Sequence, residues 1–173
     1  RRCLEILANF DFPITIQTKS DLVLRDVDIL KRIKNKEVGF TITSIDPKVE
    51  RIFEPKASNL ENRFRALEKL KENEIPTFVF FGPILPFFSD SEESIQSLLK
   101  RLNNMGIERV YFDKMNYLNT KWGKMKIFLE GNFPYALSYY KQVAEDGKLY
   151  SARLRALLEH SLSDSCSNYE IVF

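Results

Sequence analysis

Four short segments in this sequence directly follow runs of apolar residues. They are residues 18–20 (Thr-Lys-Ser), 43–46 (Thr-Ser-Ile-Asp), 82–86 (Gly-Pro-Ile-Leu-Pro) and 113–116 (Asp-Lys-Met-Asn). In proteins built from alternating strands and helices, ligands bind at the carboxyl ends of the strands. We therefore expect the chemistry of this protein to lie where these four segments meet.

Lys19 is the most distinctive residue of this set. A lysine between two hydroxyl residues at a strand end can bind a carboxylate or phosphate as a point charge, but it can equally be a solvated loop residue. Thr41 and Thr43 lie on a predicted strand, where threonine is common. Packing is their default interpretation, and hydroxyls that bond a ribose are the functional alternative. The prolines of 82–86 favour either a shaped loop with free carbonyl groups or a simple strand terminator.

Several common site motifs do not occur in the sequence. It contains no G-x-G-x-x-G run, no P-loop, and no Cys, His and carboxylate cluster with metal-ligand spacing. His160 is the only histidine and lies on a predicted late helix, which disfavours a nucleophile–histidine pair. Cys3 and Cys166 stand at opposite ends, and we expect two separate thiols, with Cys3 behaving as a small buried hydrophobe.

The elements that position these residues alternate between strands and helices along the first two-thirds of the chain. The predicted strands are 13–17, 38–43, 76–81 and 109–112, and the predicted helices between and before them are 1–9, 25–34, 59–73 and 90–105. This alternation predicts a parallel sheet whose apolar strands are buried on both faces. Further on we expect a loop over 119–131, helices over 134–146 and 150–162, and a strand or docked tail over 169–173.

Composition limits the protein class without naming a function. The 173 residues are 44% hydrophobic and 29% charged, as in one globular domain, and the net charge of +2 makes no case for a strongly basic nucleic-acid-binding domain. No apolar run approaches the roughly 20 residues of a membrane span, and no secretory signal is present, so a cytoplasmic protein is expected. The strands could belong to part of a barrel, part of an open doubly wound sheet, or a complete small sheet.

The order of motifs between Pro13 and Pro86 resembles the radical S-adenosylmethionine (radical SAM) proteins of the spore photoproduct lyase group, described broadly as DNA repair photolyase-like. The resemblance rests on segments 13–26, 38–44, 53–58 and 75–86 and on Arg63, and covers about residues 1 to 115. It implies an α/β fold, an incomplete (β/α) barrel of the radical SAM type. Residues 1–118 would hold its later βα units, and 119–173 a mostly helical extension.

The resemblance also implies a cofactor and residues that bind it. Such proteins bind S-adenosylmethionine against a [4Fe–4S] cluster, which cleaves it to a 5′-deoxyadenosyl radical that abstracts hydrogen from a substrate. By position, Lys19 would meet the methionine carboxylate, Thr41 (with Thr43 as a second candidate) the ribose or methionyl part, and Ile84 the adenine. Arg63 would either bond the carboxylate or brace the site by pairing with Glu54.

The sequence departs from this family in one important respect, because the three-cysteine motif Cys-x-x-x-Cys-x-x-Cys is absent. Cys3 falls on a later helix and is not a ligand by position. We therefore expect an upstream segment to hold the cluster, and this fragment alone to be inactive. The substrate would be nucleic acid or another macromolecule. Two alternatives remain: a non-catalytic binding or scaffold domain, and a small-molecule α/β enzyme that uses Lys19 and Asp46 as acid and base.

Overall fold

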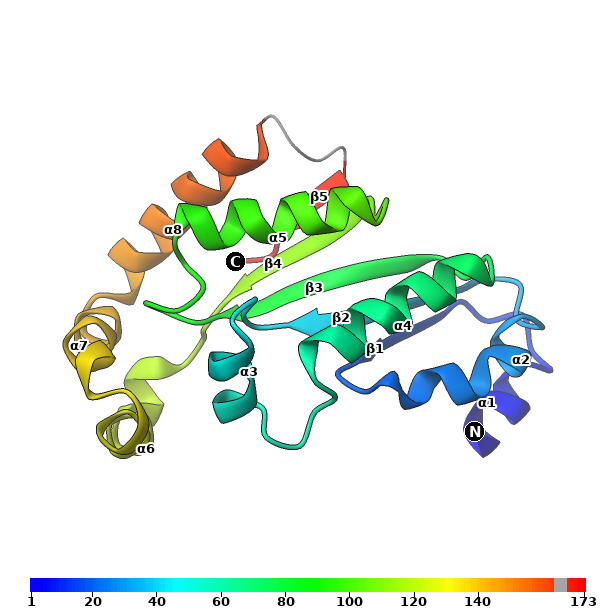
Figure 1. Ribbon diagram of the computed structural model, residues 1–173, viewed down its shortest axis with the longest axis horizontal. Helices are drawn as coiled ribbons and strands as arrows, with labels where there is room; N and C mark the ends of the chain where they lie inside the picture. Colours follow the sequence, from blue (N-terminus) through cyan, green and yellow to red (C-terminus); the bar gives the residue numbers. More distant parts are fainter. Residues whose placement is uncertain (164–167) are drawn as a thin grey trace.

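A computed structural model describes residues 1–163 and 168–173 of the chain. At its centre is a five-stranded sheet in which every strand is parallel to its neighbours (Figure 1). The strands, in chain order and in spatial order, are β1 (Ile14–Thr18), β2 (Lys36–Ile42), β3 (Thr77–Ile84), β4 (Arg109–Lys114) and β5 (Asn168–Ile171). Because consecutive strands are also neighbours, successive crossovers wind the sheet in one direction, as in part of a barrel. The expected incomplete (β/α) barrel is confirmed.

Helices follow the strands and cover one face of the sheet. They are α1 (Arg2–Leu7), α2 (Val27–Leu30), α3 (Pro47–Phe53), α4 (Leu60–Glu72), α5 (Glu92–Asn104), α6 (Leu118–Asn132), α7 (Leu137–Glu145) and α8 (Gly147–Leu162), with short 3-10 turns at Asp21–Asp26 and Pro134–Ala136. Helices α4 and α5 lie along the sheet, whereas α3, α6 and α7 gather at one end of it (Figure 1). Because the strands run toward that end, their carboxyl termini meet there.

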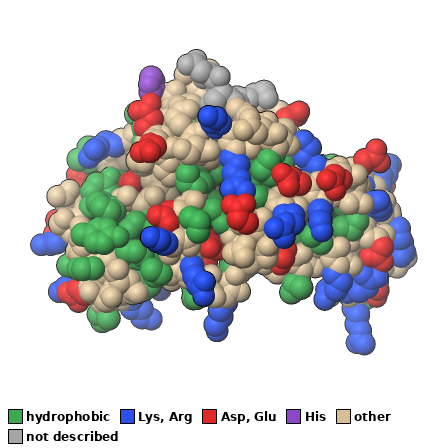
Figure 2. Space-filling view, in the orientation of Figure 1, with side chains coloured by type: hydrophobic (Ala, Val, Ile, Leu, Met, Phe, Trp, Pro, Cys, Tyr) green, Lys and Arg blue, Asp and Glu red, His purple; other side chains and the backbone are tan. Residues whose placement is uncertain are grey.

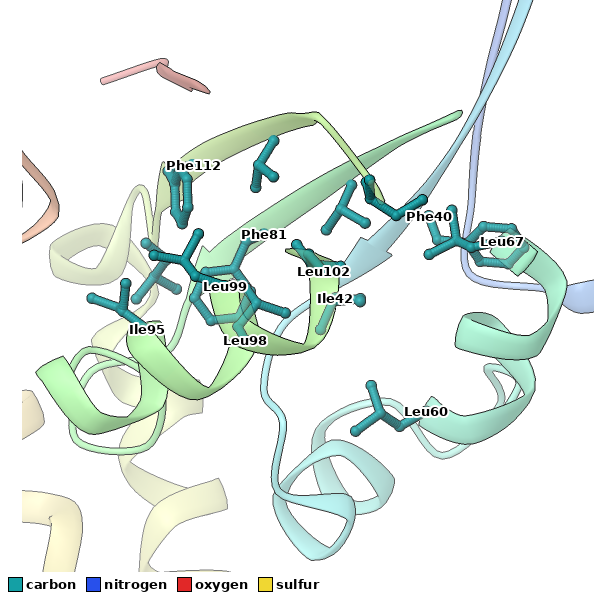
Figure 3. Packing of buried hydrophobic residues seen from close by; sticks show 14 of the residues in the cluster. Phe40, Ile42, Leu60, Leu67, Phe81, Ile95, Leu98, Leu99, Leu102 and Phe112 are labelled. Carbon is teal, nitrogen blue, oxygen red and sulfur yellow. The ribbon is translucent and has the colours of Figure 1, made fainter. Parts of the chain in front are cut away.

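The hydrophobic core lies between the sheet and helices α4 and α5 (Figure 3). Phe40 and Ile42 of β2 face α4, while Phe81 and Phe112 of the next two strands face α5. Each of these four side chains is 0% exposed, and full burial of such a side chain contributes about 1.5–3 kcal/mol. This layer fixes the strands rigidly enough to hold a site at their ends.

The alternate residues of the strands form a second surface, here called the inner face. Because successive side chains point to opposite sides of a strand, it carries Thr41, Phe80, Tyr111 and Glu170, which lie side by side in register across β2 to β5. Two of these residues are polar, in contrast to the hydrophobic core, and two are aromatic. The inner face is therefore suited to contact a ligand.

One local prediction was wrong, and one helix was missed. Residues 119–131 are not a loop but most of α6. A helix was disfavoured there by Gly123 and Gly131, yet a Cβ atom placed on either glycine would meet nothing within 4 Å. Burial of Leu118 and Leu129 outweighs the weak helix propensity of these glycines. Helix α3 was not predicted, because its seven residues are too few for a clear apolar period.

The ends of the chain supply further outcomes. The alternative of a terminal strand is confirmed, since β5 pairs with β4 and extends the sheet beyond residue 118. Cys3 is exposed and not buried, because α1 is a short edge helix with no buried residue. Cys166 lies outside the described residues. In the part of the chain that the structure describes, no helix is long and apolar enough to cross a membrane.

Candidate functional site

Two capped helices, α3 and α4, carry charged residues to the carboxyl ends of β1 and β2. Asp46 caps α3 by accepting hydrogen bonds from the main-chain N–H groups of Lys48 and Val49. Glu50 and Glu54 follow one helical turn apart, so both carboxylates point the same way. Asn59 caps α4 by accepting a hydrogen bond from the main-chain N–H group of Asn62, which fixes the helix that carries Arg63.

Arg63 is the centre of a buried ion network. Its side chain is 0% exposed, and its guanidinium pairs with Glu50 at 2.6 Å and with Glu54 at 2.7 Å. The same group donates hydrogen bonds to the carbonyl oxygens of Ser58 and Thr41. With its donors engaged inside the protein, Arg63 ties α3 and α4 to β2. Of the two roles considered for it, the pairing with Glu54 is present; a contact of Arg63 with the cofactor carboxylate stays a prediction.

Lys19 joins this network from the end of β1. Its Nζ lies 2.6 Å from Oε1 of Glu54, and its side chain is 41% exposed. Two cations and two carboxylates therefore meet, and Lys19 is the one member that also reaches solvent. Burial raises the pKa of the Glu50 carboxyl, and the Arg63 guanidinium opposes this shift. The network holds the lysine amino group at the strand end without leaving a buried charge unpaired.

The two threonines differ in what their hydroxyls contact. Thr41 Oγ1 accepts a hydrogen bond of 3.0 Å from Nε2 of Gln17, which links β1 and β2 on the inner face. Thr43 Oγ1 is buried and has no hydrogen-bond partner among the residues that the structure describes. A buried hydroxyl without a partner is costly, so Thr43 is the better placed of the two to bond a ligand.

Ile84 and Asp46 do not present free groups at the site. The Ile84 side chain is 0% exposed within the hydrophobic cluster, so an adenine contact there stays a prediction. Asp46 is engaged as a helix cap, which argues against the acid–base pair of Lys19 and Asp46.

The sequence alone missed two residues of this arrangement. Glu50 lies on the unpredicted helix α3, and its spacing from Glu54 is the signal that could have found it. Gln17 looks like an ordinary edge-strand residue until Thr41 is seen beside it. Within the described ranges, no group of three or more His, Cys, Asp and Glu residues could hold a metal ion.

The family model of the Radical SAM superfamily matches residues 1–102. Uncharacterized protein MJ0683 of Methanocaldococcus jannaschii is 37% identical over 131 residues, covering 75% of this chain and 48% of that protein. Uncharacterized protein ORF301 of Acidianus two-tailed virus is 29% identical over 139 residues, covering 73% and 46%. The chain thus spans about half the length of these relatives.

Solved structures with the same fold include two different enzymes. Spore photoproduct lyase complexed with dinucleoside spore photoproduct superposes with a TM-score of 0.61 at 17% identity, covering 99% of this chain and 54% of that one. Streptococcus suis SuiB bound to precursor peptide SuiA gives 0.60 at 12% identity, covering 99% and 34%. At these identities the likeness establishes the fold alone.

Proposed function

The chain belongs to the radical SAM superfamily, and we propose that it forms the S-adenosylmethionine-binding wall of a larger radical enzyme. The observation that carries the proposal is the position of Lys19 and Thr43, which follow the ends of the adjacent strands β1 and β2. Lys19 supplies a partly exposed cation held by the Arg63 network, and Thr43 supplies a buried hydroxyl that has no hydrogen-bond partner in the described part of the chain. A carboxylate and a hydroxyl of the cofactor would complement these two groups.

The residues present fit the cofactor in this way. Lys19 would bind the methionine carboxylate, and Thr43 would bond the ribose or methionyl part. Thr41 would act beside it, since its hydroxyl accepts from Gln17 and still has a proton to donate. Arg63 would position Lys19 through Glu54. Ile84, whose side chain is buried in the core, would approach the adenine through its main chain.

The described residues do not fit an iron–sulfur cluster, because they contain no set of three candidate ligands. The ligands of a [4Fe–4S] cluster would come from elsewhere in the longer protein. Bound S-adenosylmethionine, together with that cluster, supplies a 5′-deoxyadenosyl radical that takes hydrogen from the substrate. What this chain contributes is binding and orientation of the cofactor.

For the substrate we propose nucleic acid. Support comes from a structure of the same fold, spore photoproduct lyase complexed with dinucleoside spore photoproduct, and from the motif order described above. Positive and negative side chains are interspersed over the helix-covered surface (Figure 2), so this face offers no extended basic patch for a nucleic-acid backbone. The inner face is the more suitable surface for a base.

The decisive experiment measures cofactor binding to the full-length protein by isothermal titration calorimetry. Lys19→Ala removes a charge-assisted hydrogen bond, which contributes about 1.5–3 kcal/mol, so S-adenosylmethionine should bind about 10- to 100-fold more weakly. Lys48→Ala is the matched control, because Lys48 is an exposed lysine on neighbouring α3 and its side chain makes no ion pair among the described residues. Its affinity should equal that of the wild type.

Cofactor cleavage provides a second readout. Reduced, cluster-reconstituted full-length protein should form 5′-deoxyadenosine, and Lys19→Ala should form less at subsaturating cofactor. Equal affinity in the two lysine variants would mean that Lys19 is only a solvated loop residue. A protein that binds the cofactor but never forms 5′-deoxyadenosine would be the non-catalytic binding domain considered as an alternative.

A further inference from the structure

The inner face carries a second set of groups at the ends of β3 and β4, next to the end of β2 where Thr43 lies. Phe81 pairs with Phe112 across these strands, and both side chains point into the core. The next residues, Gly82 and Asp113, therefore point to the opposite, inner face. Phe80 lies on the same face, two residues before Gly82 on the same strand.

The absence of a side chain at Gly82 brings Phe80 and Asp113 together. A Cβ atom placed on Gly82 would lie 2.7 Å from the Phe80 ring and 3.1 Å from Cβ of Asp113. Any larger residue would have to displace both neighbours. The glycine thus lets an aromatic ring lean toward the carboxyl end of the sheet, where it lies beside a carboxylate.

The Asp113 carboxylate has unused capacity to accept hydrogen bonds. Its side-chain partner is Asn116, whose Nδ2 lies 3.3 Å and 3.5 Å from the two carboxylate oxygens. It forms no ion pair with any described residue, because the amino group of the adjacent Lys114 donates to Ser151. The main-chain N–H and the charge of Lys114 nevertheless favour the ionised carboxylate. Partial burial raises the pKa of Asp113 above its ordinary value. A carboxylate in this position gains from a donor supplied by a ligand.

We propose that Phe80 and Asp113 form the subsite that selects the substrate: a planar base stacks on the Phe80 ring and donates an N–H group to the Asp113 carboxylate. This inference rests on the proposed function, because it assumes that the substrate is nucleic acid bound on the inner face. Stacking on an aromatic ring tolerates every base. The hydrogen bond to Asp113 adds selection for bases whose exposed edge carries an N–H donor.

A methylated base isolates this hydrogen bond. The probe is a fluorescein-labelled oligothymidylate, compared with the same strand in which one thymine is N3-methylated and so lacks its N–H group. Binding to the full-length protein is measured by fluorescence anisotropy with S-adenosylmethionine present. Methylation should weaken binding to the wild type about tenfold, the loss expected for one hydrogen bond to a charged acceptor. In Asp113→Ala the two strands should bind equally.

Two further variants keep the test specific. Phe80→Leu should weaken both strands by the same factor, because it removes stacking and leaves Asp113 in place. Glu108→Ala, at the opposite end of β4, should behave as the wild type with both strands. A methylation penalty that persists in Asp113→Ala, or that is absent from the wild type, overturns the subsite, as does failure of the oligothymidylate to bind at all.

Cofactor affinity in the same samples separates this inference from the proposed function. Asp113→Ala should retain wild-type affinity for S-adenosylmethionine, since Asp113 lies on the far side of Gly82 from Thr43. If the wild type does not bind the cofactor, the proposed function itself fails. If the cofactor binds and the strands are not discriminated, the subsite alone fails.

Discussion

Replacing Arg63 by methionine, Arg63→Met, tests the reasoning about the buried network most directly. The substitution keeps an apolar stem but removes a guanidinium that contacts Glu50, Glu54 and two carbonyl oxygens. Two buried carboxylates then lack their shared cation. Breaking a buried pair in this way costs about 3–5 kcal/mol, because an uncompensated charge stays buried.

The destabilisation should depend on pH. Burial already raises the pKa of Glu50 above 4.5, with Arg63 opposing the shift. Without Arg63 the pKa rises further, so the folded state holds this proton more tightly than the unfolded state does. The stability contributed by the protonated form is complete below pH 4.5 and is lost as the pH rises through the raised pKa. The variant should therefore be closest to the wild type in acid.

Urea unfolding followed by circular dichroism at about pH 5 and pH 7 measures both effects. The matched control is Arg101→Met, which removes an arginine that pairs with Glu61 at the surface and lies over the Phe64 ring. An exposed pair contributes about 1 kcal/mol or less. If Arg63→Met costs no more than Arg101→Met, or if its cost does not grow between the two pH values, the network does not hold the site as argued.

Further predictions concern packing and a second buried acid. Gly39→Ala should lower the free energy of unfolding by about 1–3 kcal/mol, because its Cβ would lie 2.2 Å from the Phe78 ring. Gly123→Ala should instead stabilise by about 0.5–1 kcal/mol, since its Cβ would meet nothing within 4 Å; equal effects of the two substitutions in urea would contradict the packing described. Burial raises the pKa of Asp90 above 3.8, against the hydrogen bond from Tyr139. The stability that the protonated carboxyl contributes is therefore lost as the pH rises above that value. Asp90→Asn should flatten the dependence of the melting temperature on pH between about pH 4 and 7. An unchanged pH dependence would show that Asp90 does not titrate differently on folding.

The motif order in the sequence was sufficient to predict the family and the alternation of strands and helices. The apolar strands, the cap at Asn59 and the left-handed residue Gly106 that follows α5 are local features of the structure. They could be predicted because each depends on a few neighbouring residues. Helix α6 could not, because its glycines are tolerated only where nothing packs against them.

The candidate site was predictable as a set of places and not as a set of roles. Lys19, Thr41, Thr43 and Arg63 were all singled out by strand ends or motif position. Which hydroxyl is free, and which cation is buried, depended on partners far away in the chain: Gln17 for Thr41, and Glu50 and Glu54 for Arg63. Cofactor roles for these residues stay predictions.

By itself, therefore, the sequence determined a parallel α/β chain of the radical SAM type with its polar groups at the strand ends. Only the tertiary structure decided that Arg63 pairs with Glu54 and that Phe80 lies beside Asp113 across Gly82. The physical reason is distance along the chain. Local propensity predicts only whether a residue lies in a helix, a strand or a turn. The charge balance and the free hydrogen-bonding capacity of a site are set by side chains that folding brings together.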